Sequence, residues 1–599
     1  MLKSLVRYAR KFKFALASNR FRIERILKVF SVLISLGAVV AIICQHGCYL
    51  SEEMELRTSA IVVVAFCFYV FKYFLRSLYE MKFLTYLKNN KLESVIILLL
   101  LIAVIFSHQL QDLFSLSDSV FPHYRQLFFH IFYFFIFFVE IAKVSTVLKK
   151  INMSPPLLML LSFFVLIAMG TLLLLMPKAT TNGISFTDAL FTATSASCVT
   201  GLTSVNTALC FTTTGYIILM VLMQLGGMSI LSFATFFISF LSHSYTGLRY
   251  QYMVKDMLST NRVADSFSFL REIIVVTFVI EGVGALMLYM YWRTTGLFVD
   301  DGETILYSIF HAISAYNNAG FSLWPESLMS SDVVNSHFPQ MIIMILVFAG
   351  GIGYVVIRDF FDPRVIRERK KKRWMKLTDG TQIALITSFA IIITGTIIFY
   401  FLEANNTLVG KGNPFDKVFA SLFQVVAGRT AGFNIVDINA ISIPAILLFI
   451  VIIFIGASPG STGGGIKTTT FFVILKSISA TIKGKSKIEF RKKTIPFSIV
   501  DKAYSIVVMS LVFIISSTFL LAIIDPEIPL KNLMFEATSA FTTCGLSTGC
   551  IADFSVAGKL VLTLNMYIGR IGTLTFAYAL SKRVKETRHE YPETSFMVG

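Results

Sequence analysis

The chain has 599 residues, of which 55% are hydrophobic and 15% charged, and its net charge is +18. Soluble domains carry about 25% charged and about 45–50% apolar residues, so this composition excludes a soluble protein. Apolar stretches of about 20 residues, enough to cross a bilayer, recur from end to end and predict an all-α polytopic membrane protein.

Residues 1–150 are predicted to form an N-terminal extension with about four membrane spans, near 28–45, 58–77, 94–112 and 127–145. A basic amphipathic segment, MLKSLVRYARKFKFALASNRFRIER, precedes the first span. It is too long for the charged part of a signal peptide, and no small-residue cleavage site follows it. Two roles are compatible with this extension, namely packing against lipid and contacts within a dimer.

After the extension, one pattern recurs four times: an apolar span, a short semi-polar helix, a glycine-centred polar stretch and a second apolar span. The polar stretches are SASCVTGLT (195–203), SAYNNAGFS (314–322), VAGRTAGFN (426–434) and SAFTTCGLS (539–547). Their glycines are separated by 119 (320 − 201), 112 (432 − 320) and 113 (545 − 432) residues. This spacing predicts four repeats, at 151–250, 251–378, 379–495 and 496–599.

The segment before each glycine, such as SFTDALFTATSAS (185–197), is too short to cross the bilayer and predicts a re-entrant half-helix. Non-helical backbone at membrane depth is tolerated only where protein buries it or a water-filled cavity lies beside it. Four such segments therefore predict one shared cavity, faced by the negative ends of four helix dipoles. Asp188 and Asp416 lie near half-helix starts, where carboxylates cap free N–H groups, and Glu536 lies deep enough to hydrogen-bond the polar stretch.

The polar stretches have the properties of a monovalent-cation site. Glycine admits torsions that turn carbonyl oxygens inward, and a ring of carbonyls can replace the water shell of an ion. A divalent cation favours carboxylate ligands, which the stretches lack; close helix packing is the competing role for the glycines. The predicted ion-path residues are Cys198, Val199, Thr200, Gly201, Asn317, Asn318, Ala319, Gly320, Thr430, Ala431, Gly432, Thr543, Cys544 and Gly545. The polar residues around them are expected to be supports more than direct ligands, namely His311, Asn317, Asn318, Arg429 and Asn434.

The second span of the third repeat is interrupted by GASPGSTGGGIKTTT (456–470), which no other repeat shares. Pro459 and the glycines at 463–465 break a helix there. A phosphate-binding loop is excluded because Ile466 stands where that motif requires a glycine before the lysine. In the last span, LVLTLNMYIGRIGTLTFAYAL (560–580), Arg570 lies near the middle, where it must face protein or water unless it snorkels.

These features resemble the Trk/Ktr/HKT superfamily of potassium transporters, specifically its KtrB-like and TrkH-like membrane subunits. SAYNNAGF, RTAGFN and SAFTTCGLS are similar to its filter signatures, and PPLLMLLSFFVLIAMGTLLLLMPKA (155–179) to its first core helix. The resemblance covers 150–599 and implies four M1–P–M2 units, each two spans and a pore half-helix, with potassium at the filter carbonyls. In plant relatives a serine at the first filter position goes with sodium preference; Gly201 implies potassium, with a sodium-preferring or sodium-coupled transporter as the alternative.

The resemblance also implies a gate. The segment 456–470 is similar to an intramembrane loop below the filter, with a passive kink as the alternative, and glycine hinges let such a loop move at small cost. The gate residues are then Gly456, Ser458, Pro459, Gly460, Gly463, Gly464, Gly465 and Lys467. The family has a cation at the position of Arg570 that faces the pore, so we expect Arg570 to restrain conduction.

Basic residues concentrate in the N-terminal segment, at 364–376, at 483–493 and after Ser581, whereas 46–56, 112–126 and 294–304 are nearly free of Lys and Arg. The positive-inside rule then places both termini in the cytoplasm, with the chain in the plasma (inner) membrane. The resemblance implies a homodimer and a cytosolic KtrA/TrkA-like ring that supplies nucleotide binding. The basic loops are candidates to contact that ring or lipid, and no nucleic-acid partner is expected.

The seven cysteines form no CxxC pair or His cluster, so neither a metal site nor a disulfide framework is predicted. The filter chemistry does not require Cys198 or Cys544. A membrane-embedded enzyme would need His, Asp or Glu residues that converge near one membrane face, and the eight histidines form no such constellation. The sequence therefore predicts a transporter without a covalent cofactor.

Overall fold

A computed structural model describes residues 20–79, 155–228, 266–331, 333–361, 366–367, 370, 377–410, 412–580 and 594. The predicted spans near 94–112 and 127–145, most of the basic loop 364–376 and the tail after Ser581 lie outside these residues. Five described helices are long and apolar enough to cross a membrane, or up to seven if each of two bent helix pairs counts as one span. The prediction of a polytopic, mainly helical chain is confirmed.

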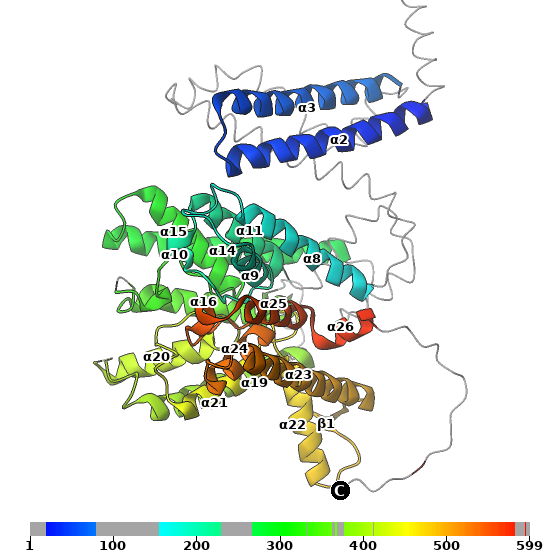
Figure 1. The fold of residues 1–599 in the computed structure, drawn as a ribbon. Coiled ribbons are helices and arrows are strands. Elements are labelled where there is room, and N and C mark those ends of the chain that lie inside the picture. Colours follow the sequence, from blue (N-terminus) through cyan, green and yellow to red (C-terminus); the bar gives the residue numbers. More distant parts are fainter. Residues whose placement is uncertain are drawn as a thin grey trace, which may run out of the picture.

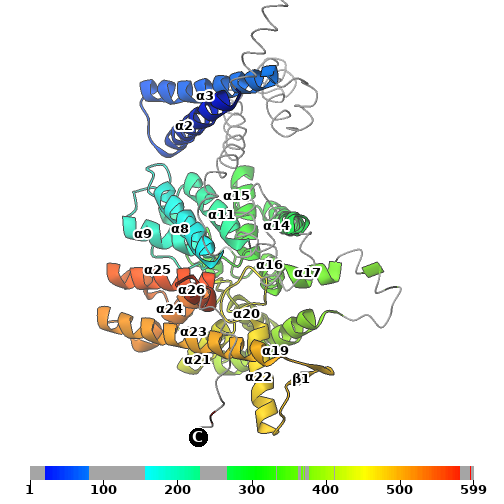
Figure 2. The ribbon, with the colours of Figure 1, turned by 90° about the vertical axis from the view of Figure 1, so that its right-hand side faces the viewer.

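The two described helices of the N-terminal extension form a hairpin. Helices α2 (Arg20–Gly47) and α3 (Glu52–Tyr79) pack through small residues, among them Ala38 and Ala65. The hairpin lies above the other described helices in both ribbon views (Figures 1 and 2). Its turn reaches them where the backbone N–H of Lys178 donates to the carbonyl of Gly47 at 2.9 Å.

The other described helices fall into four consecutive groups, which Figure 2 shows in chain order around a common centre. The first is α8 (Pro155–Leu174), α9 (Phe186–Ser197), α10 (Thr207–Cys210) and α11 (Thr213–Gly227). The second is α14 (Ser266–Thr295), α15 (Asp301–Tyr316), η2 (Ser327–Met329), α16 (His337–Ile352) and α17 (Tyr354–Phe361). The third is α19 (Asp379–Glu403), α20 (Pro414–Ala427), α21 (Ile443–Phe454) and α22 (Thr468–Ile482). The fourth is α23 (Phe497–Ile524), α24 (Leu530–Thr542), η3 (Cys550–Asp553), α25 (Val556–Ile571) and α26 (Thr573–Leu580).

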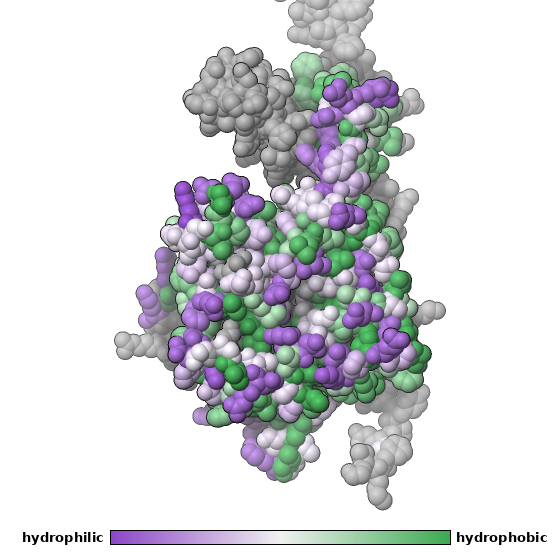
Figure 3. Space-filling view, turned by 60° about the vertical axis from the view of Figure 1, so that its left-hand side comes forward, coloured by the Kyte–Doolittle hydropathy of each residue, from purple (hydrophilic) through white to green (hydrophobic). Residues whose placement is uncertain are grey.

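Each group begins with a helix of 20 to 30 residues and continues with one of 12 to 16 residues. The long helices expose large apolar side chains, such as Phe164, Val279 and Ile515, as expected for helices that face lipid. Hydrophilic residues form separate patches between hydrophobic ones on the face in Figure 3. The shorter helices are buried toward their C-terminal ends, so they converge on the interior.

The second span of a repeat is broken in more places than the sequence predicted. Helix α16 meets α17 at 97° and α25 meets α26 at 93°, in addition to the break between α21 and α22. The two bends lie at Gly353 and Gly572, both with φ +89°. The expectation that only the third repeat interrupts this span is therefore wrong. A single glycine in an apolar run carries no helix-breaking signal until its left-handed conformation is known.

A small departure from an all-helical chain occurs between α22 and α23, where β1 (Glu489–Phe490) pairs antiparallel with β2 (Lys493–Thr494). The two turn residues, Arg491 and Lys492, have φ values of +48° and +66°. This combination is typical of the two-residue turns whose twist matches a hairpin. The hairpin presents part of the basic loop 483–493 at the surface.

In three groups the second span crosses the end of its own half-helix at a glycine. A Cβ placed on that glycine would overlap a backbone carbonyl of the residue at or beside the half-helix end. The pairs are Gly226 with Ser197, Gly350 with Tyr316 and Gly569 with Phe541. The close approach of these helices therefore requires residues without side chains.

We expect Gly569→Ala to lower the thermal unfolding midpoint of the purified protein in detergent. The added methyl would overlap the Phe541 carbonyl, and backbone overlap of this kind costs about 1–3 kcal/mol. Gly380→Ala is the matched control, because Gly380 is exposed in α19 with no atom near its Cβ position. A midpoint for Gly569→Ala equal to that of the control would contradict the close approach.

Candidate functional site

The predicted ion-path residues lie together at the centre of the bundle, directly after the four half-helices. The two residues before each glycine are 0% exposed: Val199, Thr200, Asn318, Ala319, Thr430, Ala431, Thr543 and Cys544. Backbone N–H groups fold back onto carbonyls of the last helical turn, as from Thr200 to Ser195 at 2.8 Å and from Ala319 to Ser314 at 2.7 Å. Each stretch is thus fixed to the end of its half-helix.

The backbone takes the same unusual course in all four stretches. The residue two before the glycine has a positive φ, namely Val199 (+56°), Asn318 (+58°), Thr430 (+69°) and Thr543 (+50°). The glycine follows with a φ between +69° and +93° in each stretch. Left-handed torsions at β-branched residues cost about 1–3 kcal/mol each unless the surroundings hold them. The same left-handed course at four equivalent positions, three of them β-branched (Val199, Thr430 and Thr543), indicates that the backbone itself has a function here.

The four glycines form a closed ring, the glycine ring, in which each abuts the next stretch in chain order. A Cβ on Gly320 would lie 2.7 Å from the carbonyl oxygen of Ala431, and one on Gly432 would lie 3.0 Å from that of Cys544. A Cβ on Gly201 would meet the Ala319 oxygen, and one on Gly545 would meet the Thr200 oxygen, which closes the ring. Backbone carbonyls from all four repeats therefore surround one point, and no side chain fits between them.

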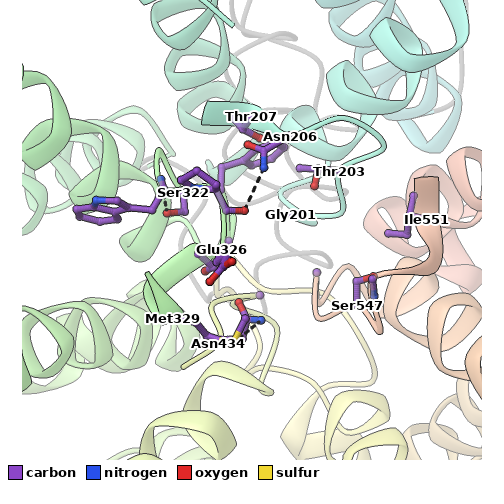
Figure 4. Close-up of a pocket in the computed structure, with 18 of the residues that line it drawn as sticks. Gly201, Thr203, Asn206, Thr207, Ser322, Glu326, Met329, Asn434, Ser547 and Ile551 are labelled. Carbon is purple, nitrogen blue, oxygen red and sulfur yellow. Dashed lines mark hydrogen bonds between the residues drawn. The ribbon is translucent and has the colours of Figure 1, made fainter. Parts of the chain in front are cut away.

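A cavity of about 420 Å³ lies against the glycine ring and contains all four of its glycines in its lining. Figure 4 shows Thr203, Ser322, Asn434 and Ser547 around this space, one from each group. The lining also holds two carboxylates and no Lys, Arg or His among the described residues. Its potential is therefore expected to favour cations over anions.

Polar side chains from the half-helices hold the chain that follows each glycine. In the second group, Nε2 of His311 lies 3.2 Å from Oγ of Ser322. In the third, the backbone N–H of Ile435 donates to Gln424 at 3.3 Å. In the fourth, Oε1 of Glu536 accepts from the backbone N–H of Thr548 at 2.7 Å and from two nearby hydroxyls. Glu536 therefore hydrogen-bonds the backbone just after the predicted polar stretch, at Thr548, and contacts the stretch itself only through the hydroxyl of Ser547.

The interrupting segment 456–470 lies on the other side of the stretches. A Cβ on Gly463 would meet the Thr430 hydroxyl, and one on Gly464 would meet the Thr543 hydroxyl. The backbone N–H of Ser458 donates to the carbonyl of Gly351 at 3.0 Å, while Pro459 and Gly460 lie beside the bend at Gly353. The segment folds on itself where Gly456 contacts Gly465, both with positive φ.

Two basic side chains hold this segment. Arg570 is 2% exposed and donates to the carbonyl of Thr462 and to that of Gly226. Nζ of Lys467 donates to the carbonyl of Gly463 at 2.6 Å. At the crossing of the second span, Gly226 is followed by Gly227 in the first group and Gly350 by Gly351 in the second. In the fourth group, Gly569 is followed by Arg570. Arg570 therefore brings a guanidinium to a place where those groups have only backbone.

Two other predicted support residues, Arg429 and Asn434, have side-chain partners outside the glycine ring. Arg429 donates to Oγ of Ser388 at 3.0 Å, and Asn434 lies 3.9 Å from the sulfur of Met329. The thiol of Cys544 lies 3.4 Å from the carbonyl of Gly428, whereas Cys198 is buried among apolar side chains. Both thiols therefore have packing contacts.

The capping role predicted for Asp188 and Asp416 is wrong. The side chain that caps α9 is Ser185, which accepts from the backbone N–H of Asp188. Asp188 pairs instead with Lys559 of α25 at 2.9 Å, and Asp416 lies 3.0 Å from Nε2 of His337. The carboxylates lie inside the first turn, so they join neighbouring repeats at the half-helix starts.

Of the buried carboxylates that the sequence reasoning missed, namely Glu281, Asp359 and Glu403, Glu281 lies deepest within an apolar span. Glu281 lies in the long helix α14 and accepts from Nδ2 of Asn317 at 2.9 Å. Its signal in the sequence was a lone acidic residue deep inside an apolar span, a feature that commonly marks a functional position in a membrane protein.

Residues 124–589 match the family model described as TrkH, cation transport protein, which begins before residue 150. The Ktr system potassium uptake protein B of Bacillus subtilis is 34% identical over 459 residues, covering 76% of this chain and 98% of that protein. The protein of the same name from Vibrio alginolyticus is 36% identical over 460 residues, covering 75% and 96%. The potassium/sodium uptake protein NtpJ of Enterococcus hirae is 32% identical over 468 residues, covering 76% and 100%. The crystal structure of the potassium transporter TrkH from Vibrio parahaemolyticus has a TM-score of 0.59 at 18% identity, covering 81% and 97%, and shows a shared fold.

We expect Glu536→Ala to destabilise the protein, because it leaves the buried N–H of Thr548 without an acceptor. Such a loss costs about 1–3 kcal/mol, and thermal unfolding in detergent measures it. Glu536→Gln keeps one acceptor oxygen and should lose less stability. Glu527→Ala, at an exposed carboxylate nearby, is the control. Equal unfolding midpoints for the two alanine variants would show that Glu536 does not hold the chain at Thr548.

Proposed function

The chain belongs to the TrkH family of cation transport proteins, which are transporters and not enzymes, and we propose that it takes up potassium through the glycine ring. It is a multi-pass membrane protein. Two relatives at 34% and 36% identity are named as potassium uptake proteins, which supports potassium as the ion. The observation that carries the proposal is the closed contact of four glycines with four carbonyls beside one cavity.

A cation enters through the cavity, whose two carboxylates, Glu326 and Asp437, raise its local concentration. At the glycine ring it exchanges water for the carbonyl oxygens of Thr200, Ala319 and their two counterparts. The C-terminal ends of four half-helices converge there, and their partial negative charges stabilise the ion. Because the left-handed backbone is already in place before the ion arrives, little reorganisation opposes binding.

Beyond the ring, the interrupting segment 456–470 acts as a gate. It lies against the hydroxyls of Thr430 and Thr543, so an ion leaving the stretches meets it directly. Its glycines and Pro459 prevent a continuous helix, and such a segment can shift between two packings at small cost. Arg570 holds it closed through the carbonyl of Thr462 and adds a positive charge that repels the ion.

Orientation and partners follow from charge. Under the positive-inside rule the basic loop 483–493 lies on the cytoplasmic side. The interrupting segment and both termini lie on the same side. We propose that the chain forms a homodimer in the plasma membrane. A cytosolic nucleotide-binding ring docks on the basic loops, and its movement is transmitted through α22 to the gate.

Potassium-dependent growth of a bacterial host that lacks its own uptake systems tests the proposed transport. Expression of the chain should restore growth at low potassium, and Gly201→Ser or Gly432→Asp should abolish the rescue. Each added side chain would overlap the neighbouring carbonyl and demand a left-handed conformation. Gly410→Ser is the control, since no atom lies near its Cβ position. Rescue that survives both ring substitutions would overturn the carbonyl mechanism.

The role of Arg570 is tested by Arg570→Ala in the same host. Loss of its contacts with Thr462 and Gly226 should free the gate and raise the maximum rate of uptake by at least about tenfold, since losing a charged hydrogen bond is worth about 1.5–3 kcal/mol. Dependence on the regulatory subunit should weaken in parallel. Arg293→Ala, at an exposed arginine of α14, controls for loss of charge. An unchanged rate with unchanged regulation would rule out restraint by Arg570.

A further inference from the structure

Glu281 is a carboxylate in the interior of the membrane-spanning part of the protein. It is 4% exposed and lies within the apolar span Arg271–Thr295. The ion pairs of the described residues include none with Glu281. Placing such a group here costs far more than placing an apolar one, so its presence calls for a compensating role.

The internal repeats show what the fold requires at this place. The first spans align on a small residue, usually followed by threonine: Gly170, Gly284, Gly395 and Ser517. Three positions earlier, the other repeats have Ile167, Ile392 and Ile514, each 6% exposed. Packing is therefore satisfied by isoleucine in three of the four repeats, and the carboxylate of the second repeat serves something other than packing.

The partner of Glu281 is Asn317, which follows α15 and is 1% exposed. Its Nδ2 donates to Oε1 of Glu281 at 2.9 Å and lies 3.1 Å from Oε1 of Gln224 on α11. Its Oδ1 lies against Gly227. Three elements from two repeats thus meet on one amide, and the titratable group that faces the carboxylate from α15 is Tyr316.

Asn317 is joined directly to the strained part of the second stretch. The next residue, Asn318, has φ +58°, and Gly320 follows two residues later with its Cβ position 2.7 Å from the Ala431 carbonyl. A shift of Asn317 would therefore move the Ala319 carbonyl, which contacts Gly201 in the glycine ring. Residues at the same position in the other repeats are Cys198, Arg429 and Thr542, so this hydrogen bond to a carboxylate belongs to the second repeat.

We propose that Glu281 is a positioning residue that, through Asn317, holds in place the part of the glycine ring contributed by the second repeat, and thereby sets the preference for potassium over sodium. The proposal rests on the proposed transport function. The acceptor oxygen of Glu281 holds Asn317 in place, and the negative charge of the carboxylate is not required for this. Sodium is the smaller ion, so carbonyls that can move inward bind it better; a stretch anchored from outside resists that movement and keeps the ring at the size that suits potassium.

Three substitutions separate packing, charge and hydrogen bonding. Glu281→Ile installs the residue of the other repeats and removes the acceptor; Glu281→Gln keeps the acceptor and removes the charge. The affinity for potassium and inhibition by sodium are measured as initial uptake in the deficient host, at equal amounts of protein in the membrane. Glu281→Ile should raise the KM for potassium about tenfold, as expected for the loss of one buried hydrogen bond, and increase sodium inhibition, because Asn317 then keeps only Gln224 and the Ile313 carbonyl as acceptors. Glu281→Gln should stay within about twofold, as expected for a retained hydrogen bond, and Gly282→Ala, at an exposed position with open space, should match the wild type.

A double-mutant cycle tests whether the effect passes through Asn317. If Asn317→Ala already releases the stretch, Glu281→Ile should add no further change in KM or sodium inhibition in that background. Additive effects would overturn the proposal, as would a Glu281→Ile variant with wild-type sodium inhibition. Loss of selectivity in Glu281→Gln equal to that in Glu281→Ile would also overturn it, since charge would then be the cause.

Potassium-dependent thermal stabilisation of the purified protein provides a readout that does not need transport. Potassium should raise the unfolding midpoint of the wild type and Glu281→Gln more than sodium does, and Glu281→Ile should lose that difference. A wild type that takes up no potassium but keeps this difference contradicts the proposed function and leaves the positioning role supported. A Glu281→Ile protein that keeps the difference contradicts the positioning role whatever the uptake.

Discussion

The structure depends on one constraint, which is that four backbones meet at a point where no side chain fits. Each glycine of the ring abuts the carbonyl of the next stretch, and the fourth abuts the first. For this contact to form, four half-helices must end at the same depth. The four first spans that precede them must therefore run in similar directions through the bundle. It also requires left-handed torsions at residues such as Val199 and Thr543, and these torsions persist only because buried hydrogen bonds surround them.

Around this common ring the repeats differ in the side chains that hold it. The residue that clamps the following chain is a histidine in the second group, a glutamine in the third and a glutamate in the fourth. At the crossing of the second span, Arg570 stands where two other repeats have glycine. Different side chains can hold the same backbone because each supplies a hydrogen-bond partner at one place. The backbone of the ring is therefore common to the repeats, whereas the side chains that hold it differ from one repeat to the next.

The interrupting segment connects these differences. It contacts residues of the second, third and fourth groups through Gly351, Thr430 and Thr543, and Arg570 ties it to the first through the carbonyl of Gly226. One short loop is therefore linked to all four repeats, directly to three of them and through Arg570 to the first. A displacement of α22, which follows it, would change several of these contacts together, and this is the property that a gate needs.

Much of this could be predicted from the sequence because it depends on chain-local properties. Apolar length fixed the membrane class, and the spacing of Gly201, Gly320, Gly432 and Gly545 identified the stretches that meet. A break near Pro459 was readable from helix propensity. The tertiary structure decided what depends on orientation: the bends at Gly353 and Gly572, the pairing of Asp188 with Lys559 in place of capping, and the contact of Glu281 with Asn317. These follow from which faces come together across repeats, and the order of residues in one repeat does not contain that information.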